Sequence, residues 1–138
     1  MEETIPQAER NGAMFAHFSG LLAMIGMAFI HVVGPLVFYL MARDNKTPFA
    51  LEHAREALNF QITASIVWFF AIVGYVVFIV VGTLADGRPT IPSIMLGIAC
   101  ILVGLLHGIF DLVCVIVAGI AASNGRPFRY PLSIRFVR

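Results

Sequence analysis

The feature that most constrains this chain is the run PFALEHAREALNFQITASIVWFF that begins at Pro48, which is rich in charge at its start and apolar afterwards. Its opening turns carry Glu52 and Glu56, which need water. The stretch from Ile62 to Leu84 contains no Asp, Glu, Lys, Arg or His. As a helix it is long enough to cross the roughly 30 Å of hydrocarbon in a bilayer. The run therefore predicts a helix that starts at a membrane surface and then enters the membrane.

Three long apolar blocks account for most of the chain, at about residues 13–42, 57–85 and 93–122. Hydrophobic residues make up 59% of the sequence and charged residues 12%, which is more apolar surface than a core of 138 residues can bury. The formal net charge of +1 gives no sign of nucleic-acid binding. We expect a single multi-pass membrane domain over 1–138, an all-α integral membrane protein with a small bundle of three to four membrane-embedded helices.

The first block allows two arrangements, one tilted and kinked helix or a hairpin of two short helices, because it is about thirty residues long and contains Gly34-Pro35. The distribution of positive charge favours the hairpin. If the block crosses twice, every Lys and Arg except Arg88 falls on one side of the membrane, which the positive-inside rule makes cytoplasmic. We therefore favour four embedded helices in the bacterial plasma (inner) membrane, with the amphipathic start of the second long helix and the C-terminus in the cytoplasm.

Turn signals separate the blocks clearly, at ARDNKTP, DGRPTIP and SNGRP. Thr47 followed by Pro48 is a typical N-cap and first helical position, so we expect the second long helix to begin there.

The C-terminal tail, residues 124–138, has a different pattern from the blocks. In FRYPLSIRFVR, apolar residues alternate with others at a period of two, which predicts an extended segment. Two prolines make a central sheet strand unfavourable. We interpret the tail as lying on the headgroup region, with Arg129, Tyr130 and Arg135 at the membrane surface. The alternative is a frayed terminus.

His107 and Asp111 form the strongest polar signal inside a block, since a spacing of four places them on one helix face. An ionisable pair at bilayer depth is a functional hypothesis by default. Its alternative is a His–Asp bond that only locks helices together. Beside Asp111 lies a stripe of small residues where another backbone can approach, which predicts helix packing at Gly97, Gly104, Gly108 and Gly119.

Asn59 and Gln61 are the other candidates for an intramembrane polar site, where the second long helix enters the membrane. Asn59 shares a helix face with Glu52, Glu56 and Thr63, whereas Gln61 points elsewhere. These side chains line a polar cavity or bond to one another and to nearby backbone.

Histidine and cysteine give little sign of a cofactor. His17 and His31 are fourteen residues apart, as in bis-histidine haem proteins, but no second helix repeats that spacing. Cys100 and Cys114 lie in one helix about 21 Å apart and cannot form a disulfide. No zinc spacing, phosphate loop or catalytic triad is present. We expect no cofactor, no metal site and no catalytic residue.

Four stretches resemble a known family: RNGAMFAHFSGLL, GPLVFYLMARDNKTPFALEHAREALNFQI, IVAGIAASNG and FRYPLSIRFV. Together they are similar to a bacterial Tic-twenty-like membrane domain family of unknown function, related to the chloroplast inner-envelope protein-import component. The resemblance covers nearly the whole chain. It implies a small, all-helical, multi-pass membrane protein without known catalysis, whose chloroplast relatives help to form a protein-conducting assembly.

These observations favour a non-enzymatic membrane protein that serves as a helical scaffold or as a subunit of a membrane assembly. Its expected partners are the lipid bilayer and another membrane protein or further copies of itself, and no nucleic acid. The alternative is a small transporter or channel-like element that uses a polar route lined by His107, Asp111, Asn59 and Gln61.

Overall fold

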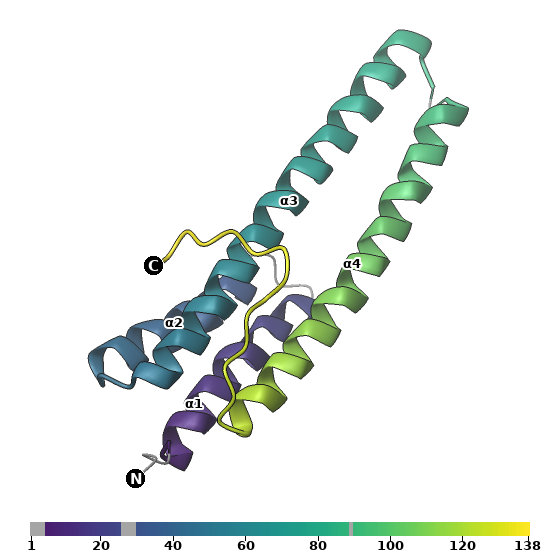
Figure 1. Ribbon diagram of the computed structural model, residues 1–138. Coiled ribbons are helices and arrows are strands. Elements are labelled where there is room, and N and C mark those ends of the chain that lie inside the picture. The colour runs from purple at the N-terminus through teal and green to yellow at the C-terminus, as the bar shows by residue number, and fades with distance from the viewer. Residues whose placement is uncertain (1–4, 26–29, 89) are drawn as a thin grey trace. The chain divides into compact units, whose positions relative to one another are not determined.

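The computed structural model describes residues 5–25, 30–88 and 90–138. The expected all-α class is confirmed, because the described residues form α-helices and one 3₁₀ helix and contain no strand (Figure 1). The elements are α1 (Gln7–Phe18), η1 (Ser19–Ile25), α2 (Ile30–Asp44), α3 (Pro48–Asp86) and α4 (Ile91–Ser123).

The first apolar block forms two helices in place of one, α1 and α2, as the hairpin alternative requires. The two helices contact each other, with the rings of Phe15 and Phe38 stacked at 6.5 Å. Gly34 of α2 lies against Ser19 of η1, so closely that a Cβ on Gly34 would be 2.5 Å from the Ser19 Cβ. Residues 26–29, between η1 and α2, lie outside the described residues. α1 and α2 are each shorter than the roughly 30 Å of hydrocarbon, and α1 continues directly into η1.

Two helices, α3 and α4, are long and apolar enough to cross a membrane. The predicted start of α3 at Pro48 is confirmed. The hydroxyl of Thr47 donates to the carbonyl oxygen of Ala42 at 3.2 Å. The predicted turn DGRPTIP lies between α3 and α4, and its residue 89 lies outside the described residues.

The C-terminal end of α4 is fixed by Gly125, which has a φ of +69°. The amide of Arg126 donates to the carbonyl oxygen of Ala121 and that of Gly125 to Ala122, the pattern of a Schellman cap. α2 ends in the same pattern, but Lys46 occupies the left-handed position with a φ of 53°. A lysine at this position carries strain that a glycine would not.

The chain divides into two compact units. The first comprises residues 1–63 and 111–138, and the second comprises residues 64–110. Small side chains fill the core of the first unit, where Ala13, Ala16, Ala54, Ala118 and Ala122 are almost fully buried.

The second unit contains the apolar parts of α3 and α4. Here the ring of Trp68 lies against Gly104 and the ring of Tyr75 against Gly97. Much of the remaining apolar surface is exposed, for example at Val67, Phe70 and Leu106, as expected for helices that face lipid.

Candidate functional site: a polar cluster that holds the tail

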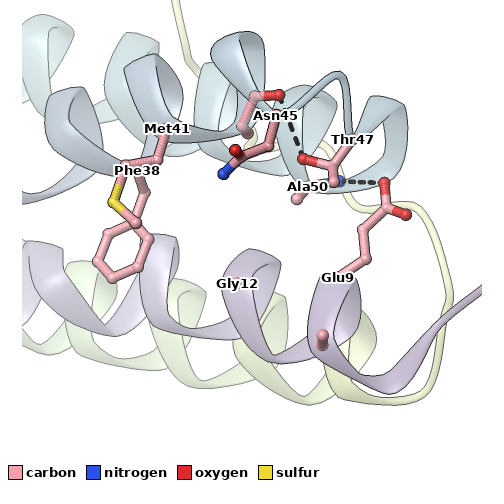
Figure 2. Close-up of a pocket in the computed structure, with 9 residues that line it drawn as sticks. Glu9, Gly12, Phe38, Met41, Asn45, Thr47 and Ala50 are labelled. Atoms are coloured by element: carbon pink, nitrogen blue, oxygen red, sulfur yellow. Dashed lines mark hydrogen bonds between the residues drawn. The ribbon is translucent and has the colours of Figure 1, made fainter.

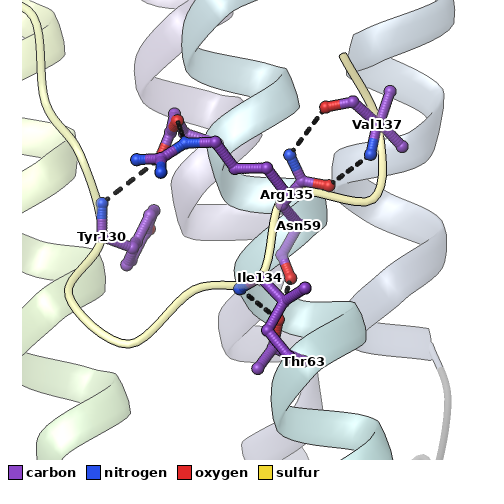
Figure 3. A network of polar contacts seen from close by, with 7 residues as sticks. Asn59, Thr63, Tyr130, Ile134, Arg135 and Val137 are labelled. Carbon is purple, nitrogen blue, oxygen red and sulfur yellow. Dashed lines mark hydrogen bonds and ion pairs between the residues drawn. The ribbon is translucent and has the colours of Figure 1, made fainter.

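One face of α3 binds the C-terminal tail through three side chains spaced along the helix, Glu56, Asn59 and Thr63 (Figure 3). The side-chain amide of Asn59 donates to the carbonyl oxygen of Val137 at 2.9 Å and accepts from its backbone N–H at 2.8 Å. The Thr63 hydroxyl accepts from the N–H of Ile134 at 3.0 Å. Asn59 thus bonds to both backbone polar groups of Val137, as a neighbouring strand would.

Glu56 is the charged member of this face and is only 6% exposed. One carboxylate oxygen lies 3.3 Å from Nε of Arg135, and the other accepts from the backbone N–H of Tyr130 at 3.4 Å. Its negative charge is therefore paired with a tail arginine, which is what a buried carboxylate needs.

His17 and His53 form the buried centre of the site together with Tyr130 of the tail. Nδ1 of His17 is 2.9 Å from the Tyr130 hydroxyl, and Nε2 of His17 is 2.8 Å from Nδ1 of His53. The three residues are between 1% and 4% exposed. The Tyr130 ring also stacks on Phe60 with centroids 4.2 Å apart. Residues from α1, α3 and the tail thus meet in one hydrogen-bonded chain.

The His–His contact restricts the protonation of this chain. Only one of the two facing nitrogens, Nε2 of His17 or Nδ1 of His53, can carry a proton if the hydrogen bond is to form. Burial, followed by the neighbouring His53 ring, lowers the pKa of His17 to about 3. Burial raises the pKa of Tyr130, so its hydroxyl stays protonated. Burial also lowers the pKa of His53, so the His17–His53–Tyr130 chain is neutral at physiological pH.

Glu9 of α1 supplies the N-terminal cap that the sequence of α3 lacks. Its carboxylate accepts from the backbone N–H groups of Phe49 at 2.7 Å and Ala50 at 3.3 Å. The first turn of α3 contains no acidic residue, so the charge of Glu9 complements the helix dipole from outside the helix.

Beside this contact lies a cavity of about 340 Å³ (Figure 2). Phe38, Met41 and several alanines form its apolar wall, while Glu9, Asn45 and Thr47 lie at its polar end.

Asp111 and Gln61, two of the predicted polar residues, are brought together in the first unit. Nε2 of Gln61 donates to a carboxylate oxygen of Asp111 at 3.2 Å, and Asp111 is 8% exposed. Gln61 also packs against Gly20, where a Cβ would be 2.6 Å from Nε2. The expectation that Gln61 faces away from Asn59 agrees with this arrangement, since Asn59 binds the tail.

His107, the predicted partner of Asp111, packs edge-on against Trp68 with ring centroids 5.6 Å apart. The partner seen for the Asp111 carboxylate is Gln61 of α3, because the amide of that side chain reaches it. No hydrogen bond joins His107 to any residue in the described parts of the chain.

The predicted glycine stripe accepts aromatic rings rather than the backbone of a neighbouring helix. Tyr75 lies at Gly97, Trp68 at Gly104 and Phe18 at Gly119, each with an atom 2.6 Å from the position a Cβ would take. Gly108 has nothing within 4 Å. The rings fill the notches that the missing side chains leave.

The predicted membrane-surface residues are placed differently from one another. Arg129 and Arg135 are exposed, whereas Tyr130 is buried at 4% exposure and contacts His17 and Phe60 in place of headgroups. The pattern of period two does not continue through the tail, because Pro131 and Leu132 form a turn.

The same-helix spacing of His17 and His31 does not apply, since His17 lies in α1 and His31 in α2. The described residues hold no group of three or more His, Cys, Asp or Glu side chains that could bind a metal.

Sequence reasoning missed the His17–His53–Tyr130 chain. The residues are 36 and 113 positions apart, and no periodicity links an N-terminal helix to a C-terminal tail. The available signal was a tyrosine that stands directly before a proline, Pro131, in the tail.

The comparison with known families gives a single assignment. A sequence profile described as the magnetosome magnetite crystal formation protein family, MamF/MmsF, matches residues 8–137. No curated protein and no solved structure matches the chain. The predicted resemblance to the Tic-twenty-like family is therefore wrong, and the implied part in protein import loses its support.

Proposed function

Because the chain belongs to the magnetosome magnetite crystal formation protein family, we propose that it acts in magnetite crystal formation as a non-enzymatic component of the magnetosome membrane. The match covers nearly the whole chain, so the proposal concerns the domain as a whole. Within that membrane the protein serves as a scaffold that contacts another membrane protein or a second copy of itself.

Membrane placement is supported by α3 and α4, which pass the length and hydropathy requirements of a span. In the apolar stretch of α3 the least polar residues are also among the most exposed, with Phe70 at 68% and Val81 at 60%. Such surface is compatible with lipid and costly in water. By the positive-inside rule, the tail arginines favour a C-terminus in the cytoplasm.

The observation that carries the scaffold role is the polar cluster of the first unit. His17, His53 and Tyr130 join two helices and the tail, while Glu56 and Asn59 hold further tail positions. Hydrogen bonds between buried side chains favour one arrangement of a core. The buried Asp111, bonded to Gln61, supports a packing role over the transport alternative, which needs a carboxylate that meets water.

The proposal is tested in a magnetosome-forming cell that lacks the gene and is complemented with variants. Wild type should restore the crystal dimensions seen by electron microscopy. Asp111→Asn should restore them equally, because an amide of the same shape keeps a hydrogen bond to Gln61.

A variant that unfolds the first unit, His17→Leu, should fail to restore crystal dimensions. Loss of crystals with Asp111→Asn at normal protein abundance would contradict the scaffold role and favour transport. Crosslinking in isolated magnetosome membranes should give a stable protein adduct, and a strictly monomeric protein there would also contradict the proposal.

A further inference from the structure

The tail presents an apolar face that no part of the described chain covers. Leu132, Ile134 and Phe136 are 86%, 57% and 49% exposed, whereas Tyr130 on the other side is 4% exposed. The backbone beneath them is fixed, because Ile134 bonds to Thr63 and Val137 to Asn59 (Figure 3). The three side chains are therefore held outward and cannot fold back onto the helices without breaking these bonds.

Leu132 is also strained. It follows Pro131 in a turn and has a φ of 60°, a conformation in which glycine is favoured. At 86% exposure its side chain makes almost no contact within the chain that offsets this strain. An exposed, strained leucine points to a contact outside the chain.

Charge identifies the class of partner. Between residues 124 and 138 the tail contains four arginines and no Asp or Glu. Arg135 is paired with Glu56, while Arg129 and Arg138 are exposed. Apolar side chains flanked by arginines match the acyl and phosphate layers of an anionic lipid surface.

The depth of the tail along α3 agrees with such a surface. The tail is bonded to Glu56, Asn59 and Thr63, and Glu56 is the last charged residue of α3 before Asp86. This is the level at which α3 passes from headgroups into hydrocarbon.

We propose that Leu132, Ile134 and Phe136, together with Arg129 and Arg138, form a binding surface for the interface of an anionic phospholipid bilayer. The tail is held by α3 as a preformed anchor, and the apolar side chains insert between acyl chains while the arginines bind phosphates. This inference rests on the membrane placement in the proposed function.

The test uses the full chain with Cys100 and Cys114 replaced by alanine and a single new cysteine labelled with an environment-sensitive fluorophore. Leu132→Cys places the label at the tip, and Ile72→Cys places it in the apolar part of α3. Lys46→Cys is the matched control, another exposed residue with positive φ, in the turn before α3. The first residue of α3, Pro48, is about 21 Å before Ile62 along the helix. Each protein is reconstituted in phosphatidylcholine vesicles with or without phosphatidylglycerol and with nitroxide-labelled acyl chains.

The label at 132 should be quenched at least threefold more than the label at 46, and adding phosphatidylglycerol should increase its quenching at least twofold. Quenching at 72 without quenching at 132 would overturn the tail proposal and leave the membrane placement standing. Absence of quenching at 72 would overturn the placement itself. Equal quenching at 132 in both lipid mixtures would overturn the anionic specificity.

Discussion

The two units of this chain are stabilised in different ways. In the first, side chains far apart in sequence meet through directional hydrogen bonds, as in the His17–His53–Tyr130 chain. In the second, α3 and α4 meet where the rings of Trp68 and Tyr75 fill glycine notches, and much of the remaining surface is apolar and exposed. Two helices that face lipid gain little from the hydrophobic effect when they associate, so close van der Waals packing must stabilise the pair.

This difference indicates a division of roles. The second unit has the composition of a membrane anchor, in which one apolar residue can replace another. The first unit depends on particular polar atoms and is the part where a single substitution should have the largest effect. The following predictions test this contrast, from the largest expected effect to the smallest.

His17→Leu should lower the free energy of unfolding by about 3 kcal/mol, because it leaves both His53 and the Tyr130 hydroxyl buried without their partner. The matched substitution in the second unit, His107→Leu, should cost less than about 1 kcal/mol, since His107 contacts mainly the Trp68 ring. Thermal unfolding in detergent micelles measures both. Equal losses of unfolding free energy for the two variants would contradict the proposed difference between the units.

Gly34→Ala should cost about 2 kcal/mol, because the new Cβ would meet both the Ser19 side chain and its carbonyl oxygen, at 2.5 Å and 3.1 Å. Gly104→Ala should cost less, since the obstacle is the tip of the Trp68 ring, which can rotate away. Gly108→Ala, with nothing within 4 Å, is the neutral control. A larger loss for Gly104→Ala than for Gly34→Ala would show that the second unit is the more rigidly packed.

Much of the fold was predictable from local patterns, and little of the site was. The apolar runs, Pro48 and SNGRP set the helices and their ends through spacing, φ restriction and turn chemistry. Asn59 was placed on the correct face with Glu56 and Thr63, yet its partner is a backbone segment 78 residues away. Glu9 contacts α3 and His17 contacts Tyr130 only because tertiary packing brings them together. No fixed spacing in a single sequence predicts such contacts.

Acidification should weaken the first unit. The pKa of His17 is lowered to about 3 in the folded protein, whereas an unfolded histidine titrates near 6.5, so the unfolded state binds more protons between these values. Stability is therefore complete above about pH 6.5 and falls as the pH drops toward 3. Between pH 7.5 and 5.5 the loss should be about 1 kcal/mol.

The control for this pH dependence is His17→Gln, which removes the titrating ring and keeps groups that can hydrogen-bond. Its unfolding free energy, followed by thermal melts at both pH values, should change less than that of wild type. If the stability of His17→Gln changes with pH as much as that of wild type, the pH dependence comes from other groups that face the cluster, among them His53, Glu52 and Glu56.

The smallest effects are expected at turns. Lys46→Gly should raise the free energy of unfolding by about 0.5 kcal/mol, because glycine adopts the φ of 53° without strain but gains entropy on unfolding. Gly87 in the second unit has a φ of +69° and open space around it, so Gly87→Ala should lower the free energy of unfolding by about 1 kcal/mol. Chemical denaturation gives both values. A lower free energy of unfolding for Lys46→Gly would mean that contacts of the lysine side chain stabilise the fold by more than its backbone strain costs.

The central claim is that the first unit holds the C-terminal tail in one place on α3, and hydrogen exchange of the tail amides in lipid nanodiscs tests it most directly. The amides of Ile134 and Val137 donate to Thr63 and Asn59, so they should exchange at least tenfold more slowly than that of Arg138, and Asn59→Ala should abolish the protection of Val137. Exchange of all three amides at the rate of an unstructured peptide would contradict the account and leave the tail as a frayed terminus.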